Sequence, residues 1–221
     1  MDLTSIAKRI AFASGLARTR YSLLIDPATV FELLSALRRG EHLDGDVIEV
    51  GVARGKTTVF LNRFMDSLNS TKRYIALDTF GGFTQSDVDY ERQHRHKPYS
   101  YRGEFTYNSV ARWRRTVLAA NGIGRADIIQ GDIKNVQLPE EMRFSTALID
   151  VDLYLPTLAA LRKIYARLVP GGTIVVDDVL NQSKYDGAYE AFMTMVGEAR
   201  TSASWSVVPP NCGVIVRRPD P

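Results

Sequence analysis

The sequence feature that most constrains the fold is an alternation of short apolar runs with segments of helical length. The apolar runs lie at 47–50, 74–77, 128–129, 147–149 and 173–176, and each stops at or near an acidic residue or a glycine. Segments long enough for helices follow most of them, at about 56–68, 107–121, 155–168 and 185–200. This alternation is typical of parallel strands that are buried on both faces and joined by helical crossovers. The pattern predicts an α/β, doubly wound fold with a mostly parallel sheet.

The C-terminal part of the chain departs from this alternation. Two strand-like runs, at 205–208 and 214–217, follow each other without a helix between them. The connection between them is short and rich in proline, which favours a tight turn. We therefore expect an antiparallel hairpin at one edge of the sheet.

The N-terminal part predicts a helix that precedes the first strand. Asp26 followed by Pro27 is a helix-start signal, because an aspartate caps the helix and a proline suits its first position. Gly40 is expected to end this helix. With 221 residues the chain is long enough for one domain. We expect a helical segment over 1–45 that packs on a domain over 46–221.

Composition excludes several classes of protein. Hydrophobic residues make up 45% of the chain and charged residues 24%, as in an ordinary folded protein, and the net charge of +3 is too small for a nucleic-acid binder. Cys212 is the single cysteine, which fits a reducing compartment. We find no run of about 18 apolar residues, which is the length that a membrane-spanning helix needs. We expect a cytoplasmic protein without nucleic-acid or membrane partners, and a homo-oligomer stays open.

One long segment, 79–104, has no sustained hydrophobic period. A structureless segment of this length in a compact domain is usually a lid, a binding loop or disordered. We expect a lid that becomes ordered with a ligand, and the alternative is a plain solvated loop.

Acidic residues follow the predicted strands. In open α/β sheets ligands bind beyond the carboxyl ends of the strands, so these side chains are expected to face one crevice. They are Glu49, Asp78, Asp132, Asp150, Asp177 and Asp178, and the first is followed by a glycine-containing turn, Gly51 to Gly55.

The turn after the first strand does not match the common phosphate-binding motifs. A dinucleotide fingerprint needs a glycine where Ala53 stands. A P-loop would end in Gly55-Lys56-Thr57, but its leading glycine would fall at Val50. A P-loop-like nucleotide-binding protein is kept as an alternative from another class.

Electrostatics favours a ligand with positive charge at this turn. A carboxylate at Glu49 repels phosphate and attracts an ammonium or sulfonium group, and S-adenosylmethionine carries both cations. The turn and the following helix N-terminus, with Thr57, would hold its carboxylate. Asp78 would accept hydrogen bonds from the ribose, and Asp132 from the adenine amino group. The predicted cofactor-binding residues are Glu49, Gly51, Arg54, Gly55, Thr57, Asp78, Asp132 and Ile133.

With these motifs the chain resembles a class I S-adenosylmethionine-dependent methyltransferase, through residues 47–55, 74–80 and 131–132. The pair of motifs at 148–157 and 170–178 narrows the resemblance to the macrocin O-methyltransferase family, which methylates sugar hydroxyls in natural products and requires magnesium. The resemblance implies a Rossmann-like, seven-stranded sheet and a small-molecule substrate that contains a sugar. A catechol-type O-methyltransferase, acting on a phenolic diol, is the alternative within the same chemistry.

Three aspartates are candidates for binding Mg²⁺. Asp150, Asp177 and Asp178 should end neighbouring strands, and magnesium prefers such hard oxygen ligands. The matching positions are the metal ligands in the family that the chain resembles. A helix-capping role is the alternative for Asp177 and Asp178.

The predicted catalytic residues are Asp150, His94 and His96, any of which could take the proton from the acceptor hydroxyl. Basic residues beside the histidines, Arg95, Lys97 and Arg102, could instead hold an anionic group such as the diphosphate of a nucleotide sugar. More often such a charge run is a solvated surface.

Overall fold

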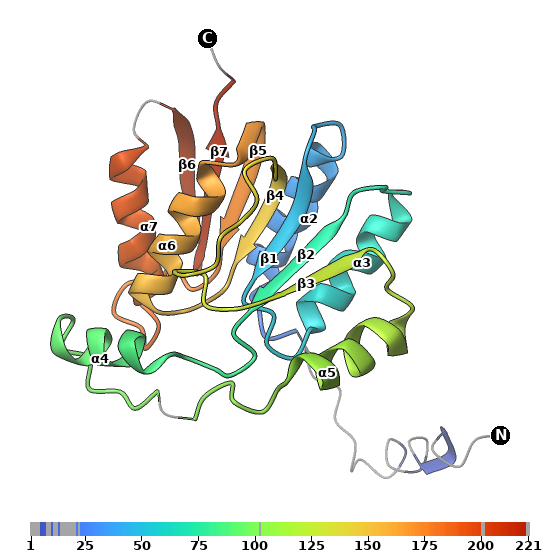
Figure 1. Ribbon diagram of the computed structural model, residues 1–221, viewed down its shortest axis with the longest axis horizontal. Helices are drawn as coiled ribbons and strands as arrows, with labels where there is room; N and C mark the ends of the chain where they lie inside the picture. The colour runs from blue at the N-terminus through green and yellow to red at the C-terminus, as the bar shows by residue number, and fades with distance from the viewer. Residues whose placement is uncertain are drawn as a thin grey trace.

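The computed structural model describes residues 5–7, 10, 13, 21, 23–101, 103–199 and 202–219. Seven strands form one sheet in the order β3-β2-β1-β4-β5-β7-β6 (Figure 1). The strands are β1 Asp46–Val50, β2 Tyr74–Asp78, β3 Ala126–Gln130, β4 Phe144–Ile149, β5 Leu168–Val176, β6 Ala203–Val208 and β7 Cys212–Arg217. Strands β1 to β5 are parallel to one another, and β7 is antiparallel to its two neighbours, β5 and β6. The predicted mostly parallel, seven-stranded sheet with a C-terminal antiparallel hairpin is confirmed.

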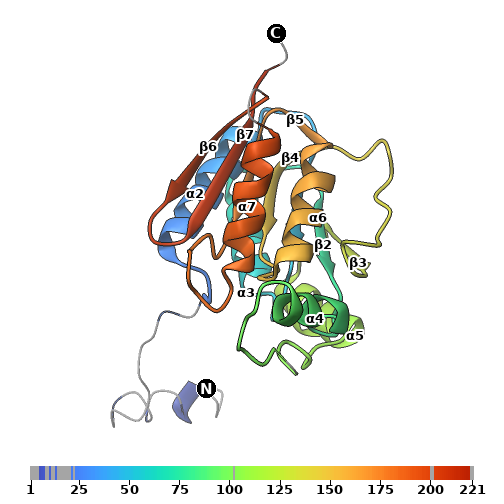
Figure 2. The ribbon, with the colours of Figure 1, turned by 90° about the vertical axis from the view of Figure 1, so that its left-hand side faces the viewer.

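Helices cover both faces of the sheet. Figure 2 shows α6 and α7 on the near side of the sheet and α2 on the far side. The helices of the α2 side are α2 Pro27–Gly40, α3 Lys56–Ser67 and α5 Val110–Trp113, which continues as a π-helix over Arg114–Ala119. Those of the other side are α6 Tyr154–Tyr165 and α7 Gly187–Glu198. Two separate apolar clusters therefore stabilise the sheet, one on each face.

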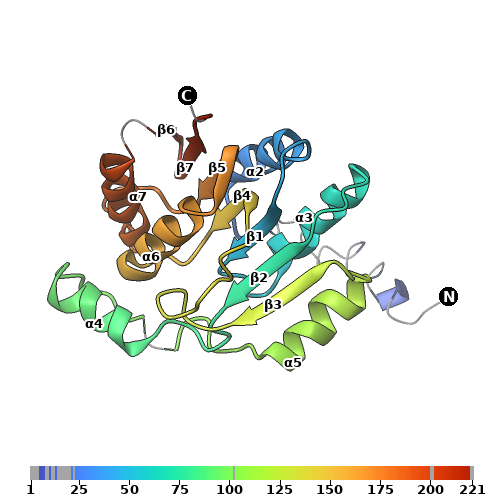
Figure 3. The same ribbon diagram turned by 45° about the horizontal axis from the view of Figure 1, so that its top comes forward.

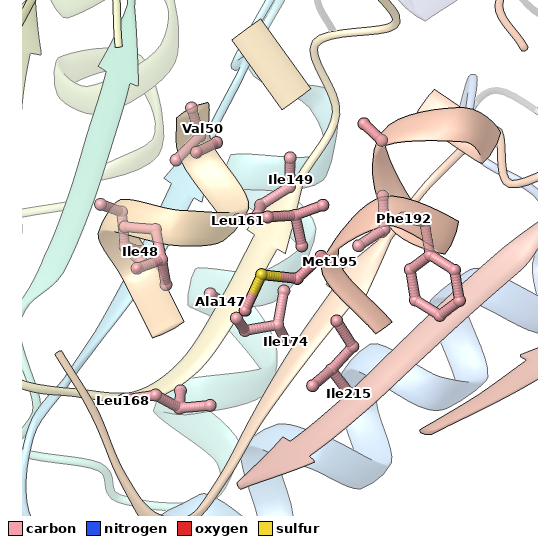
Figure 4. Close-up of a cluster of buried hydrophobic side chains, with 14 of the residues drawn as sticks. Ile48, Val50, Ala147, Ile149, Leu161, Leu168, Ile174, Phe192, Met195 and Ile215 are labelled. Atoms are coloured by element: carbon pink, nitrogen blue, oxygen red, sulfur yellow. The ribbon is translucent and has the colours of Figure 1, made fainter. Parts of the chain in front are cut away.

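Strand β1 illustrates why the apolar runs are continuous. Side chains of successive strand residues point to opposite faces. Ile48 packs in the cluster under α6 and α7, whereas Val47 packs in the cluster under α2 and α3. Figure 4 shows Leu161, Phe192 and Met195 of the two helices gathered over apolar side chains of the strands. Because both faces are covered, both sets of side chains must be apolar.

The predicted helix after Asp26 forms as expected. The Asp26 carboxylate accepts a hydrogen bond from the amide of Ala28, and Pro27 occupies the first turn. Most of the segment before it, which we expected to be helical, lies outside the described residues, as does Arg102. None of the helices in the described part of the chain has the length and apolar character that a membrane crossing needs.

The expectation that residues 79–104 lack regular structure is wrong. This segment contains α4, Gln85–Gln93, which begins at Thr84; the Thr84 hydroxyl accepts from the amide of Asp87. The helix has few apolar residues, so it has no hydrophobic period that the sequence could reveal. Figures 1 and 3 show α4 beyond the carboxyl ends of the parallel strands.

The predicted helix over 107–121 is also altered. It begins only at Val110 and changes from α-helix to π-helix at Arg114. Ser109 caps it by accepting a hydrogen bond from the amide of Arg112.

Candidate active site

A cavity of about 220 Å³ lies at the carboxyl ends of the parallel strands. Turns after β1, β2, β3, β4 and β5 all contribute to its wall, as do residues of the segment between β2 and α5. Seven aspartates line it: Asp78, Asp87, Asp132, Asp150, Asp152, Asp177 and Asp178. Five of the six carboxylates that the sequence places at strand ends therefore line one cavity, as predicted.

The turn after β1 is held in a conformation that needs glycine. Gly51 has φ of +91°, and a Cβ atom there would lie 1.8 Å from the carbonyl oxygen of Asp150. Asp78 fixes the next two residues, because its Oδ2 accepts hydrogen bonds from the amides of Val52 (2.8 Å) and Ala53 (3.1 Å). Asp78 thus closes the turn, a contact that the prediction of ribose binding did not include.

Glu49 is the predicted carboxylate that does not line the main cavity. It is buried, and it accepts hydrogen bonds from the hydroxyls of Thr58 and, at 2.7 Å, Tyr74. Burial raises the pKa of Glu49 to about 7, although these two hydrogen bonds act in the opposite direction. Glu49 lines a smaller cavity of about 40 Å³, which shares Gly51 and Asp150 with the main one.

The remaining predicted cofactor residues divide between the two cavities. Asp132 and Ile133 line the main cavity, whereas Arg54 and Thr57 line the smaller one. Gly55 lines neither; it packs against Trp113 and Val117. The hydroxyl that bonds to Glu49 belongs to Thr58, one residue beyond the predicted Thr57.

Asp132 and Arg54 already have partners. Asp132 accepts a hydrogen bond from the amide of Lys134 and forms an ion pair with its ammonium group. The Arg54 guanidinium lies over the ring of Tyr107, 4.6 Å from its centre. The structure therefore gives each of these predicted residues a local contact as well as a place at a cavity.

Three aspartates form a compact cluster at the ends of the adjacent strands β4 and β5. One carboxylate oxygen each from Asp150, Asp177 and Asp178 lies within 4.8 Å of the others. The backbone fixes their positions, because the amide of Asp177 donates to the carbonyl of Ile149 at 3.0 Å and the amide of Asp150 donates to that of Val50 at 2.9 Å. Burial and the Asp177 carboxylate hold the pKa of Asp150 well above its ordinary value. Burial and Asp178 raise the pKa of Asp177 to about 7.

This donor set fits a divalent cation. All three groups are hard oxygen donors, and like charges so close together repel unless a cation or protons neutralise them. The raised pKa values of Asp150 and Asp177 express that repulsion together with burial. Mg²⁺, which commonly uses a few carboxylates and completes its shell with water and substrate oxygens, suits the cluster.

Asp152 is a site residue that the sequence argument missed. It is buried, lines the main cavity and has φ of +62°. Burial and the nearby Asp178 carboxylate hold the pKa of Asp152 well above its ordinary value. The spacing Asp150-Val151-Asp152 could have indicated a second carboxylate after β4.

The predicted histidine bases lie away from this cluster. His94 and His96 are exposed and line neither cavity, and the His94 ring stacks on Tyr90. The structure does not bring them to Asp150.

The neighbouring cations are also engaged elsewhere. Arg95 forms ion pairs with Glu91, Asp186 and Glu190, and Lys97 pairs with Asp186. The predicted solvated surface is therefore wrong for these two residues. That they hold an anionic group such as a diphosphate stays a prediction.

A family model of macrocin-O-methyltransferase (TylF) matches residues 33–201. The chain belongs to the macrocin-O-methyltransferase family. It is an S-adenosylmethionine-dependent O-methyltransferase, as the resemblance of its strand-end motifs implied. The P-loop alternative is wrong, because the turn that resembles half a P-loop lies within the residues that match this methyltransferase family.

Solved structures with the same fold include two further O-methyltransferases. The O-methyltransferase NovP is 16% identical with a TM-score of 0.67, over 85% of this chain and 77% of that chain. The calicheamicin methyltransferase CalS11 is 21% identical with a TM-score of 0.70, over 100% of this chain and 95% of that chain. Its apo structure, described as a TDP-rhamnose 3'-O-methyltransferase, is 20% identical with a TM-score of 0.62, over 98% and 94% of the two chains. Comparison with curated protein sequences gives no match.

Proposed function

We propose that this macrocin-O-methyltransferase family member transfers the methyl group of S-adenosylmethionine to a hydroxyl of a sugar or glycosylated natural product, with Mg²⁺. The observation that carries the proposal is that the cluster of Asp150, Asp177 and Asp178 opens into the same cavity as the glycine turn. The sugar acceptor is supported by the family and by CalS11, which is a TDP-rhamnose 3'-O-methyltransferase.

The residues around the glycine turn suit the methyl donor. The smaller cavity offers Glu49 and Asp150 to an ammonium group. The N-terminus of α3 adjoins this cavity and favours a carboxylate. Ile133 and the turn after β3 offer an apolar wall and backbone groups to an adenine ring, and Asp78 faces the same cavity.

Asp150, Asp177 and Asp178 would hold the metal ion. When bound, Mg²⁺ supplies Lewis-acid activation, which lowers the pKa of an acceptor hydroxyl. The protein then has to align the hydroxyl oxygen with the methyl carbon and exclude water. The oxygen–carbon bond forms as the carbon–sulfur bond breaks, and the electron pair of that bond stays on sulfur, giving S-adenosylhomocysteine.

We assign the proton acceptor to Asp152 in place of Asp150, His94 or His96. Asp152 lies in the cavity beside Asp178, whereas both histidines are exposed. Positive charge from the methyl donor favours the ionised form of Asp152, which can then accept the hydroxyl proton at a carboxylate oxygen.

The test follows methyl transfer from labelled S-adenosylmethionine to uncharged deoxysugar glycosides and to a catechol, with Mg²⁺ or with EDTA. We expect Mg²⁺-dependent methylation of a glycoside. The D178A variant should lose turnover by about 100-fold or more, while its affinity for S-adenosylhomocysteine stays within about threefold.

The matched control is D127A, which removes an exposed aspartate of β3 away from the cavity. Its turnover should equal that of the wild type. Full activity of the wild type in EDTA, or of D178A with Mg²⁺, would contradict the metal proposal. Methylation of the catechol alone would favour the phenolic alternative.

A further inference from the structure

We propose that Thr29 of α2 is a positioning residue that orients Asp177 for metal binding. The Thr29 hydroxyl donates a hydrogen bond to Oδ1 of Asp177 at 3.0 Å, and both side chains are buried, with exposed fractions of 0% and 5%. This inference rests on the proposed metal site. Thr29 and the helix turn that carries it precede residues 33–201, which the family model matches.

The Thr29 hydroxyl contacts the Asp177 carboxylate, which the other two carboxylates of the cluster repel. Asp177, Asp178 and Asp150 repel one another at the distances of the cluster. A single hydrogen bond from a rigid donor fixes the plane of the Asp177 carboxylate, and its other lone pairs stay available to an ion. Groups of this kind, which hold metal ligands in place, typically change metal affinity by about 10- to 100-fold when they are removed.

The position of Thr29 is set by α2 and not by the strand that carries Asp177. Asp26 caps the helix, and Leu33 and Leu37 anchor it in the cluster on that face of the sheet. Thr29 lies in the first turn, and its branched side chain has few rotamers in a helix. The helix therefore places the hydroxyl beside Asp177 independently of the strand that carries this aspartate.

A second contact to the aspartate cluster also comes from a residue outside the range 33–201, this time on its C-terminal side. Asn211, in the turn between β6 and β7, donates from Nδ2 to Oδ1 of Asp178 at 3.4 Å. The backbone carbonyl oxygen of Asn211 accepts a hydrogen bond of 2.7 Å from the amide of Val179. The Thr29 contact is the shorter and more buried of the two side-chain contacts, so it is the one to test.

The experiment measures Mn²⁺ affinity, by paramagnetic resonance of the free ion, in the wild type and in T29V, T29S and T146V, without methyl donor or acceptor. T29V keeps the shape of threonine but removes the hydroxyl, and T29S keeps the hydroxyl. T146V is the matched control, because Thr146 is a buried threonine that donates to the carbonyl of Ala36 on the same helix. Thermal unfolding of each apo variant is measured in parallel.

We expect T29V to bind Mn²⁺ about 10-fold or more weakly than the wild type, and T29S and T146V to bind within about threefold of it. Equal Mn²⁺ affinity of T29V and the wild type would overturn the positioning role, as would a loss in T29S as large as that in T29V. If T29V does not fold, the T29A and T29S pair makes the same comparison. A wild type that binds no Mn²⁺ is a different outcome, because it overturns the metal part of the proposed function itself.

Discussion

Gly51 shows how much a single residue decides in this protein. Its φ is positive, and a Cβ atom at this position would lie 1.8 Å from the carbonyl oxygen of Asp150, so the turn after β1 packs directly on the turn after β4. A side chain here must push the two turns apart, so the cavity beside the turn and the cluster of aspartates depend on the same glycine.

We predict that G51A weakens the binding of S-adenosylhomocysteine by at least about 10-fold, because the new Cβ atom displaces the turn. The control is G197A: Gly197 is exposed in α7, and a Cβ atom there meets nothing within 4 Å. G197A should bind normally and unfold at a slightly higher temperature, since alanine is favoured in helices by roughly 1 kcal/mol. Calorimetry checks the affinities, and normal binding by G51A would refute the prediction.

The raised pKa of Glu49 predicts that the stability of the protein depends on pH. This pKa is about 7 in the folded protein against an ordinary value of 4.5. The Glu49 carboxyl group therefore stays protonated to higher pH in the folded protein than in the unfolded chain. The stabilisation is therefore complete below pH 4.5 and is lost as the pH rises to about 7.

E49Q should remove this part of the pH dependence, because glutamine carries no titrating proton and its carbonyl oxygen can still accept from Thr58 and Tyr74. The free energy of unfolding of E49Q minus that of the wild type should rise by about 3 kcal/mol between pH 4.5 and 7.5. Urea unfolding of the apo protein at several pH values measures it. A difference that does not change with pH would exclude a raised pKa at Glu49.

At the scale of the element, α4 is held to the fold by ion pairs at both of its ends. Lys134 pairs with Asp87 near the start of the helix. Arg95, just after its end, pairs with Glu91 and with two carboxylates at the start of α7, Asp186 and Glu190. The Glu91 carboxylate also accepts a hydrogen bond of 2.8 Å from the amide of Tyr154 at the start of α6. The segment expected to be a lid thus carries a helix that ion pairs and a hydrogen bond hold to the fold.

We predict that R95M destabilises the protein by about 3–5 kcal/mol, because it leaves buried carboxylates without their cation. Amide hydrogen exchange in α4 should become faster. R162M removes the Arg162 partner of Glu198 from an exposed ion pair and should cost about 0–1 kcal/mol with unchanged exchange in α4. Equal effects of the two substitutions would show that the Arg95 cluster does not anchor α4.

At the scale of the whole molecule, charge is distributed unevenly. The chain has a net charge of +3, yet seven aspartates line one cavity. Arg95 and Lys97, which follow α4, are paired with carboxylates, and Lys184, which precedes α7, pairs with Glu104. The methyl donor and a divalent ion would neutralise part of this negative charge, and the remainder acts on the acceptor.

We therefore predict that an uncharged glycoside is a better acceptor than the same sugar linked to a nucleoside diphosphate, with kcat/KM at least about 10-fold higher. The measurement compares the two acceptors at equal Mg²⁺ and at two salt concentrations, because salt weakens charge repulsion. A preference for the nucleotide sugar would show that cations outside this lining bind the diphosphate.

The sequence predicted the elements best where burial fixed the residue pattern. Strands β1, β2, β4 and β5 needed apolar residues on both faces, and the turns after them needed acidic residues or glycine. Helix α4 was not predicted, because ion pairs and not a stripe of apolar residues hold it to the fold. The roles of His94 and His96 were predicted from side-chain chemistry alone. Charged side chains carry no period, and nothing in their order reveals which distant carboxylate they meet.

By itself, the sequence determined the parallel sheet, its C-terminal hairpin and the gathering of carboxylates at one end, because hydrophobic period and strand endings are local properties. Only the tertiary structure decided which carboxylates meet. Adjacent residues of an extended strand point to opposite faces, and φ of +58° at Asp178 breaks that alternation beside Asp177. Thr29, far away in the chain, reaches Asp177 because packing brings α2 to the end of β5. Such contacts depend on the fold as a whole, since they join residues that no local pattern connects.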